Sequence, residues 1–198
     1  KDFKYQYPNV TAAGSWRTVS SANTARGSGT SSGTGSSSIV YGGFSNPPAT
    51  RYANAESWNG TNWTEVGDLN TARNASGGAG VSNTSALAFG GMVPPNTGDT
   101  ELWAGSSWTE VNNLNTARST LAGAGIAESW NGTNWTEVNN LNTARNGGAY
   151  GSTGSYTDCL CIGGNSGSVQ AIVEQWNGTN WTEVADLSAA KEELMGSG

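Results

Sequence analysis

One short phrase recurs five times along the chain, and no other feature constrains its fold as strongly. The sequence Trp-Thr-Glu-Val, or a near copy of it, begins at Trp16, Trp63, Trp108, Trp135 and Trp181. Successive phrases lie 47, 45, 27 and 46 residues apart. A period of this length indicates an array of one supersecondary unit, in which each copy packs on its neighbours.

The repeat divides the chain into copies, which we interpret as parts of a single domain over residues 1–198. Four copies, numbered here in chain order, cover residues 20–66, 67–111, 112–138 and 139–184. We expect residues 1–19 and 185–198 to close the array together as one further unit, and the alternative is that the full-length chain continues beyond residue 198. The first of these segments ends in a tryptophan phrase, and the second aligns with the start of the second copy.

Each complete copy predicts four β-strands, which we call a, b, c and d in chain order. In the second copy a stretch of small residues ends at Gly80, an apolar run precedes Gly90-Gly91, and two further runs carry Trp103 and Trp108. Short β-favouring runs between Gly, Pro and Asn are typical of strands and turns. The pair Asn59-Gly60 predicts a tight hairpin between strands c and d, because both residue types tolerate positive φ.

The copies resemble the kelch repeat over nearly the whole chain. A double glycine follows Tyr41, Phe89 and Ile162, as in the kelch motif, and Trp58 with Trp63 is similar to the kelch Tyr…Trp pair. The resemblance implies an all-β, kelch-like β-propeller of about five blades, each of four antiparallel strands, with one blade incomplete. The repeat sequence Trp-Asn-Gly-Thr-Asn-Trp-Thr-Glu-Val, followed by Asn-Thr-Ala-Arg, also resembles kelch-like arrays encoded by marine bacteria and their phages.

A propeller fixes where each strand should lie. Strand a lies at the axis, where only small residues fit, so we expect residues 72–80 and 145–151 to be innermost. Strand d lies at the rim. We therefore expect its tryptophans, Trp63, Trp108, Trp135 and Trp181, to be structural and mostly buried between blades.

The third copy breaks the pattern because it is about 19 residues shorter than the others. It passes from the strand a sequence to strand c at Ala127, without strand b and its double glycine. Losing strand b would leave two ladders of backbone groups unpaired inside the sheet. We therefore favour an interruption near Ile126, with residues missing from the sequence, over a genuine deletion that pairs strand a directly with strand c.

The residues give no basis for catalysis, and we expect the protein to be neither an enzyme nor a binder of metals or cofactors. The absence of histidine removes the commonest general base and metal ligand, and it contradicts a copper site like that of kelch-containing oxidases. Eight of the fifteen acidic residues are repeat positions, which is typical of a structural role. Cys159 and Cys161 share one face of a predicted strand, where we expect them to pack as small apolar residues.

Four arginines recur once per copy and match the arginine that opens each kelch blade: Arg26, Arg73, Arg118 and Arg145. We favour a structural role, in which they bridge adjacent blades through repeat glutamates and backbone carbonyls, since the planar guanidinium suits such contacts. The alternative is a ring of positive charge that binds an anionic ligand.

The connections between strands b and c vary from copy to copy while the flanking frame repeats. Variable loops on a rigid repeated scaffold are the natural place for recognition. We therefore take as candidate binding residues seven side chains from these loops: Asn46, Arg51, Tyr52, Asn96, Asp99, Asn165 and Gln170.

Net charge and hydropathy limit the classes of partner that the chain can be expected to bind. A net charge of −6 with nine basic residues argues against nucleic acid, and no apolar run is long enough to span a bilayer. Together with the phage resemblance, this predicts a structural or adhesive module of a virion or tail appendage, located on the virion or outside the cell. Other virion or surface proteins are the expected partners, with glycans and further copies of the chain as open alternatives. The second hypothesis is a secreted, lectin-like kelch protein.

Overall fold

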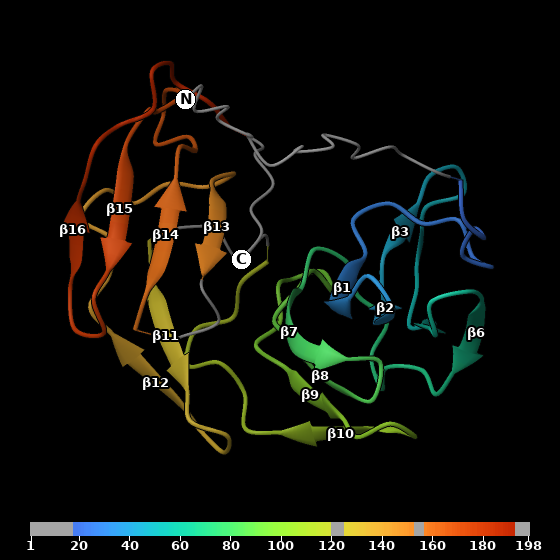
Figure 1. Ribbon diagram of the computed structural model, residues 1–198. Helices are drawn as coiled ribbons and strands as arrows, with labels where there is room; N and C mark the ends of the chain where they lie inside the picture. Colours follow the sequence, from blue (N-terminus) through green and yellow to red (C-terminus); the bar gives the residue numbers. More distant parts are fainter. Residues whose placement is uncertain (1–17, 120–124, 153–156, 193–198) are drawn as a thin grey trace, which may run out of the picture.

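The computed structural model describes residues 18–119, 125–152 and 157–192, and this part of the chain is all-β. The strands form separate antiparallel sheets that follow one another along the chain (Figure 1). No described residue lies in a helix, so none forms a helix that could cross a membrane.

Three copies contain the expected four strands in the order a-b-c-d. In the first copy these are β1 (Thr30–Thr34), β2 (Ser37–Tyr41), β5 (Ala55–Trp58) and β6 (Trp63–Val66). The second has β7 (Gly77–Ser82), β8 (Ser85–Phe89), β9 (Thr100–Trp103) and β10 (Trp108–Val111). The fourth has β13 (Ala149–Ser152), β14 (Cys159–Ile162), β15 (Val173–Trp176) and β16 (Trp181–Glu183).

The third copy differs from these three. Its described strands are β11 (Ala127–Trp130) and β12 (Trp135–Val138), which form a two-stranded sheet. A small hairpin of β3 (Phe44–Ser45) and β4 (Thr50–Arg51) completes the strands. The predicted interruption near Ile126 depends on residues 120–124, which lie outside the described residues.

The sheets are arranged with their first strands inward and their last strands outward. In Figure 1, β1, β7 and β13 lie toward the middle of the molecule, and β6, β10 and β16 lie at its edge. The strands begin later than expected, at Gly77 and Ala149, because the segment before them makes backbone bonds to other loops instead. The sheets do not form a closed ring within the described residues, and the expected closing unit falls largely on residues 1–17 and 193–198, outside them.

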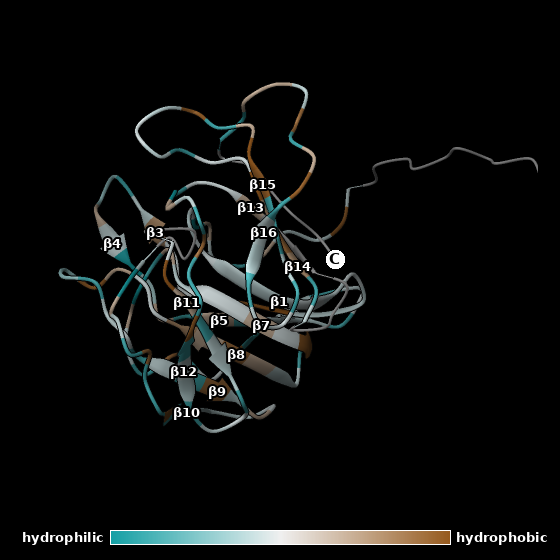
Figure 2. Cartoon of the chain, turned by 90° about the vertical axis from the view of Figure 1, so that its left-hand side faces the viewer, coloured by the Kyte–Doolittle hydropathy of each residue, from teal (hydrophilic) through white to brown (hydrophobic). Residues whose placement is uncertain are grey.

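One core cluster lies within and between the first two sheets, and further buried apolar residues lie in the sheet of the fourth copy. Ile39, Tyr41, Ala88 and Trp103 are almost inaccessible to solvent, and apolar residues concentrate in strands such as β8 (Figure 2). The expectation for the rim tryptophans holds in full only for Trp108, which is 5% exposed. The other three are half-buried.

The c–d turns close differently from the prediction. Gly60 has a φ of 93°, but Asn59 keeps a negative φ. Asn59 acts through its side chain instead, since Oδ1 accepts the N–H groups of Thr61 and Asn62 at 3.0 and 2.9 Å. The turn is therefore an Asx-type loop of four residues rather than a two-residue hairpin.

Candidate functional site

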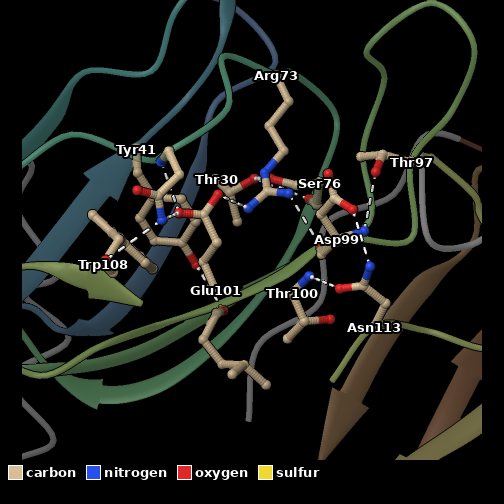
Figure 3. Close-up of polar contacts among 12 residues, drawn as sticks. Thr30, Tyr41, Arg73, Ser76, Thr97, Asp99, Thr100, Glu101, Trp108 and Asn113 are labelled. Carbon is tan, nitrogen blue, oxygen red and sulfur yellow. Dashed lines mark hydrogen bonds and ion pairs between the residues drawn. The ribbon is translucent and has the colours of Figure 1, made fainter. Parts of the chain in front are cut away.

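An ion pair between the repeat arginine and the strand c glutamate recurs in every described copy. In the second copy Arg73 Nη2 lies 2.5 Å from Glu101 Oε1, and both side chains are at most 1% exposed (Figure 3). Arg26 pairs with Glu56 at 2.5 Å, and the remaining pairs are Arg118 with Glu128 and Arg145 with Glu174. We call each of these pairs a clasp.

The clasp also holds the segment that leads into strand a. Glu101 Oε2 accepts both the backbone N–H and the side-chain amide of Asn70, each at 2.8 Å. Asn115 and Asn142 donate in the same way to Glu128 and Glu174. Each carboxylate thus ties the incoming chain to strand c of its own copy.

Hydrogen bonding keeps three of the clasp carboxylates charged. Burial alone would raise the pKa of Glu56, Glu128 and Glu174, but donors in the clasp outweigh it and hold each pKa below the ordinary value. The strongest donors are the backbone N–H of Asn23 for Glu56 and of Asn115 for Glu128. For Glu174 the strongest donor is the Arg145 side chain. These groups are engaged in holding the fold together.

The arginines join neighbouring copies through their main chain rather than their side chain. The second glycine of the double glycine donates its N–H to the carbonyl of the next copy's arginine: Gly43 to Arg73 and Gly91 to Arg118, both at 2.8 Å. Gly164 makes the same bond to Lys191, also at 2.8 Å. The expected side-chain bridge between adjacent copies is therefore replaced by a backbone bond, and the side chain stays within its own copy.

Tyr41 closes the interface between the first two copies. Its ring meets Trp108 edge-on at 4.8 Å, and its hydroxyl bonds to Ser32 Oγ at 2.9 Å and the Leu87 carbonyl at 3.1 Å. Burial raises the pKa of Tyr41 to about 12, although the Ser32 hydrogen bond and the Arg73 charge oppose this. Phe89 repeats the contact one copy later, with its ring 4.8 Å from that of Trp135.

The variable b–c loops share an anchored base. The backbone N–H groups of Tyr52, Thr97 and Gln170 each donate to the carbonyl of the second glycine before the loop, at 2.8 to 2.9 Å. The carbonyls of the same three residues accept the N–H of Arg73, Arg118 and Lys191. Because these bonds lie at the same end of each sheet, the three loops emerge at equivalent places on the array.

Most of the candidate loop residues bond within the protein. Arg51 Nε donates to Asn74 Oδ1 at 3.0 Å, with its guanidinium 5.5 Å from the Phe44 ring centre. The Tyr52 hydroxyl donates to Ser45 Oγ at 2.9 Å, and Asp99 Oδ1 accepts from Asn113 Nδ2 at 3.1 Å.

The third loop is similar. Asn165 Nδ2 donates to Glu192 at 2.7 Å, and the Gln170 amide donates to Ser166 and Ser168 at 2.8 to 3.0 Å. Asn46 and Asn96 are the candidates whose residues lie exposed at loop tips. The structure therefore places the seven residues on three loops rather than in one pocket.

A cavity that sequence analysis did not identify lies beside β11, between the second and fourth copies. It has two adjoining parts of about 210 and 360 Å³. Both parts are lined by Phe89, Ala127, Glu128, Trp135, Cys159 and Trp181. The shortened third copy was the signal that could have located it, since strand b is the part that this copy lacks.

The comparisons with known proteins support the fold alone. No protein-family model matches the chain, and no curated protein is similar to it. Among solved structures, the protein named YjhT is similar in fold, with a TM-score of 0.70 at 11% sequence identity. The similarity covers 88% of this chain and 69% of YjhT.

Proposed function

We propose that the chain is a kelch-like β-propeller module that binds a partner through its b–c loops and has no enzymatic role. One observation carries this proposal. The three loops stand on the same backbone anchor bonds, yet their tips differ in length, sequence and exposure. A fixed base under a variable tip is the arrangement expected of a recognition surface.

The fold is consistent with a propeller. Three sheets have the a-b-c-d order, first strands lie inward, and adjacent sheets are joined by a repeated backbone bond. The similarity to YjhT adds support at the level of the fold. The double glycines and paired tryptophans make kelch the preferred class within that architecture.

The charged groups support binding rather than catalysis. The four repeat arginines and their glutamate partners are engaged in clasps, and a lowered pKa holds the carboxylates of Glu56, Glu128 and Glu174 in the charged form. A general acid or base needs a pKa near the working pH and a proton to exchange with a substrate. Carboxylates in such clasps suit neither requirement.

The loop tips indicate the chemistry of the partner. Exposed residues there are neutral, and they include Asn46, Pro94, Asn96 and Ser168 together with Val169, which is 39% exposed. Uncharged amides beside apolar groups suit a neutral polar surface of another protein better than an anionic ligand. We accordingly favour a structural or adhesive module of a phage virion or tail appendage, and a secreted lectin-like protein is the second candidate.

Mass spectrometry of purified virus particles tests the virion assignment. The chain should be present in the particles after removal of loosely bound host protein. Its absence from the particles, together with a gene placed among purely cellular functions, would overturn this assignment.

A glycan array separates the two candidates. We expect no strong glycan signal for the wild-type chain. A sugar bound by the wild type, lost in Asn96→Arg and kept in Thr61→Arg, would favour the lectin. Thr61 is the matched control because it is an exposed residue in a c–d turn, at the opposite end of the strands from the b–c loops.

A further inference from the structure

Among the residues that the structure describes, the first strand of the two-stranded sheet has a partner on one edge and none on the other. Among the described strands, β11 is hydrogen-bonded to β12 alone, whereas β5, β9 and β15 each lie between two partners. An unpaired strand edge presents backbone donors and acceptors that can pair with another extended chain.

The equivalent copies identify which groups of β11 face the open edge. The first glycine of each double glycine donates its N–H to the residue before strand c, namely Asn54, Asp99 and Ile172. Ile126 occupies this position in the third copy. Because successive residues of a strand point their backbone groups to opposite sides, those of Ile126, Glu128 and Trp130 face the place of strand b.

The cavity beside β11 has the chemistry of an interior position. Its larger part is lined by Ala79 and Leu87 from the second copy, Trp130 and Val138 from the third, and Trp176 from the fourth, in addition to the residues common to both parts. Apart from Glu128, which is held in its clasp, and Ser129, the lining of this part is apolar. This chemistry favours an apolar occupant.

The neighbouring interfaces show what fills the equivalent position. Tyr41, the last residue of β2, packs on Trp108 of the next copy, and Phe89, the last residue of β8, packs on Trp135. Trp181 is the next tryptophan in this series. Among the described residues its only aromatic contact is Trp176 of its own copy. Its Nε1 is buried without a hydrogen-bond partner, as is that of Trp108, so the missing ring contact and not this donor marks the empty position.

The clasp of the third copy also contains a buried N–H group without a hydrogen-bond partner. Arg145 Nε donates to the Gly163 carbonyl at 2.8 Å, and Arg26 Nη1 donates to the Gly42 carbonyl at 3.1 Å. The third copy has no double glycine, and Arg118 Nε is buried without a partner. Arg73 Nε is also unpartnered, although its copy has a double glycine. The unpartnered Arg118 Nε is therefore consistent with a missing strand b glycine but does not by itself demonstrate one.

We propose that β11 accepts an extended segment of another polypeptide as an antiparallel strand that takes the place of strand b. The segment has the pattern of the repeat's own strand b: a short apolar run that ends in a large apolar or aromatic residue, followed by two glycines. The large residue packs under Trp181, continuing the row of contacts that Tyr41 and Phe89 begin. This site lies on the strand edge rather than on the b–c loops, so it goes beyond the proposed function.

A synthetic peptide with the sequence of residues 85–91, Ser-Ala-Leu-Ala-Phe-Gly-Gly, is the probe. Titrated into the full chain, it should change tryptophan fluorescence and shift the backbone amide signals of Glu128 and Trp130. A peptide with Asp in place of its Phe should bind at least about tenfold more weakly, because a charge would enter an apolar cavity. No change in either signal would overturn the proposal.

Two N-methylated peptides test whether binding uses the strand edge. In the second copy Ala88 lies opposite Glu101 and faces strand c, whereas Leu87 faces strand a. Methylation of the peptide nitrogen at the residue corresponding to Ala88 should weaken binding roughly tenfold, the effect of losing about one hydrogen bond. Methylation at the Leu87 equivalent should leave binding unchanged. Equal affinities for the two peptides would contradict strand addition.

A variant of the protein tests whether the peptide binds in the cavity. Ala127→Trp should fill the space beside β11 and abolish binding, while Thr133→Trp, which adds the same side chain on an exposed turn, should not. Thermal unfolding of both variants checks that they fold. If instead the chain associates with itself and protects the amides of Glu128 and Trp130 without peptide, the occupant is a second copy and the proposal of a foreign segment is wrong.

Discussion

The second and third copies carry the same clasp in different surroundings. In the second copy Arg73 and Glu101 lie inside a four-stranded sheet and are essentially inaccessible. In the third copy the Arg118 side chain is 12% exposed and the described sheet has two strands. The Asn115 bonds to Glu128 nevertheless reproduce those of Asn70 to Glu101. The clasp is therefore a contact between strand c and the incoming chain, and strand b contributes its cover.

The same comparison applies to the tryptophans. Trp135 of the third copy packs on Phe89, from strand b of the copy before it, and donates Nε1 at 3.0 Å to Thr100 Oγ1, from strand c of that copy. Trp181 follows a copy with no described strand b, and among the described residues its aromatic contact is Trp176 of its own copy. The effect of a shortened copy thus falls on the copy after it as well as on itself.

The largest expected effect comes from removing the glutamate of the buried clasp. Glu101→Ala leaves the Arg73 charge buried and unpaired, so it should lower the free energy of unfolding by about 3–5 kcal/mol. Glu128→Ala should cost less, about 1–3 kcal/mol, since water can reach part of Arg118 and hydrate it. Urea denaturation followed by tryptophan fluorescence measures both. Glu110→Ala, on an exposed residue of β10, is the control, and equal losses for Glu101 and Glu128 would break the comparison.

The second largest effect is expected from removing the strand d tryptophans of the third and fourth copies. Trp135→Ala removes a packed ring and a hydrogen bond and should destabilise the protein by about 3 kcal/mol. Trp181→Ala should cost about 1–2 kcal/mol, because among the described residues that ring has no aromatic partner from the preceding copy and its Nε1 has no hydrogen bond to lose. Denaturation midpoints compared at unchanged m-value give the difference. A larger loss for Trp181 would show that its surroundings are packed.

A matched pair of alanines sharpens the contrast in packing. Ala55 and Ala127 are both the first residue of strand c, but Ala55 is fully buried and Ala127 borders the cavity. Ala55→Leu should destabilise by about 1–3 kcal/mol through overpacking. Ala127→Leu should be neutral or stabilise by about 1 kcal/mol by filling space. Thermal unfolding of the two variants side by side decides this, and a loss at Ala127 equal to that at Ala55 would contradict it.

The smallest effect concerns Tyr41 and depends on pH. Its pKa of about 12 in the folded protein exceeds the ordinary value near 10, so the neutral phenol stabilises the fold below about pH 10 and this stability is lost as pH rises toward 12. Tyr41→Phe should cost about 1 kcal/mol at pH 8 through the lost hydrogen bonds. The gap between the two proteins should close by about 1 kcal/mol at pH 11. A gap independent of pH would show that Tyr41 titrates normally.

Periodicity predicted the strands well because it reports which residues share a face, and that is a local property of the chain. It could not select the partner of each arginine. Each copy offers two repeat glutamates, such as Glu101 and Glu110, with the same period. Only the sheet shows that Glu101 is buried beside the incoming chain while Glu110 is exposed on β10.

Loop chemistry was less predictable still. The variable loops were located from the sequence, but the internal bonds that engage Gln170 and Tyr52 depend on loop conformations that no spacing specifies. The cavity was missed for a related reason. It is formed by three copies together, whereas the sequence displays each copy separately.

The bond between consecutive copies runs from one main chain to another, from a glycine N–H to a carbonyl. It is the same whether the acceptor residue is Arg73, Arg118 or Lys191. The joint is kept when a stretch of coding DNA that carries a complete copy is duplicated or lost, because each of the three complete copies presents the same glycine N–H to the carbonyl that follows it. An array built in this way can change its number of units by recombination while its side chains diverge, and nearly identical phrases in successive copies are the trace that such duplication leaves in a sequence.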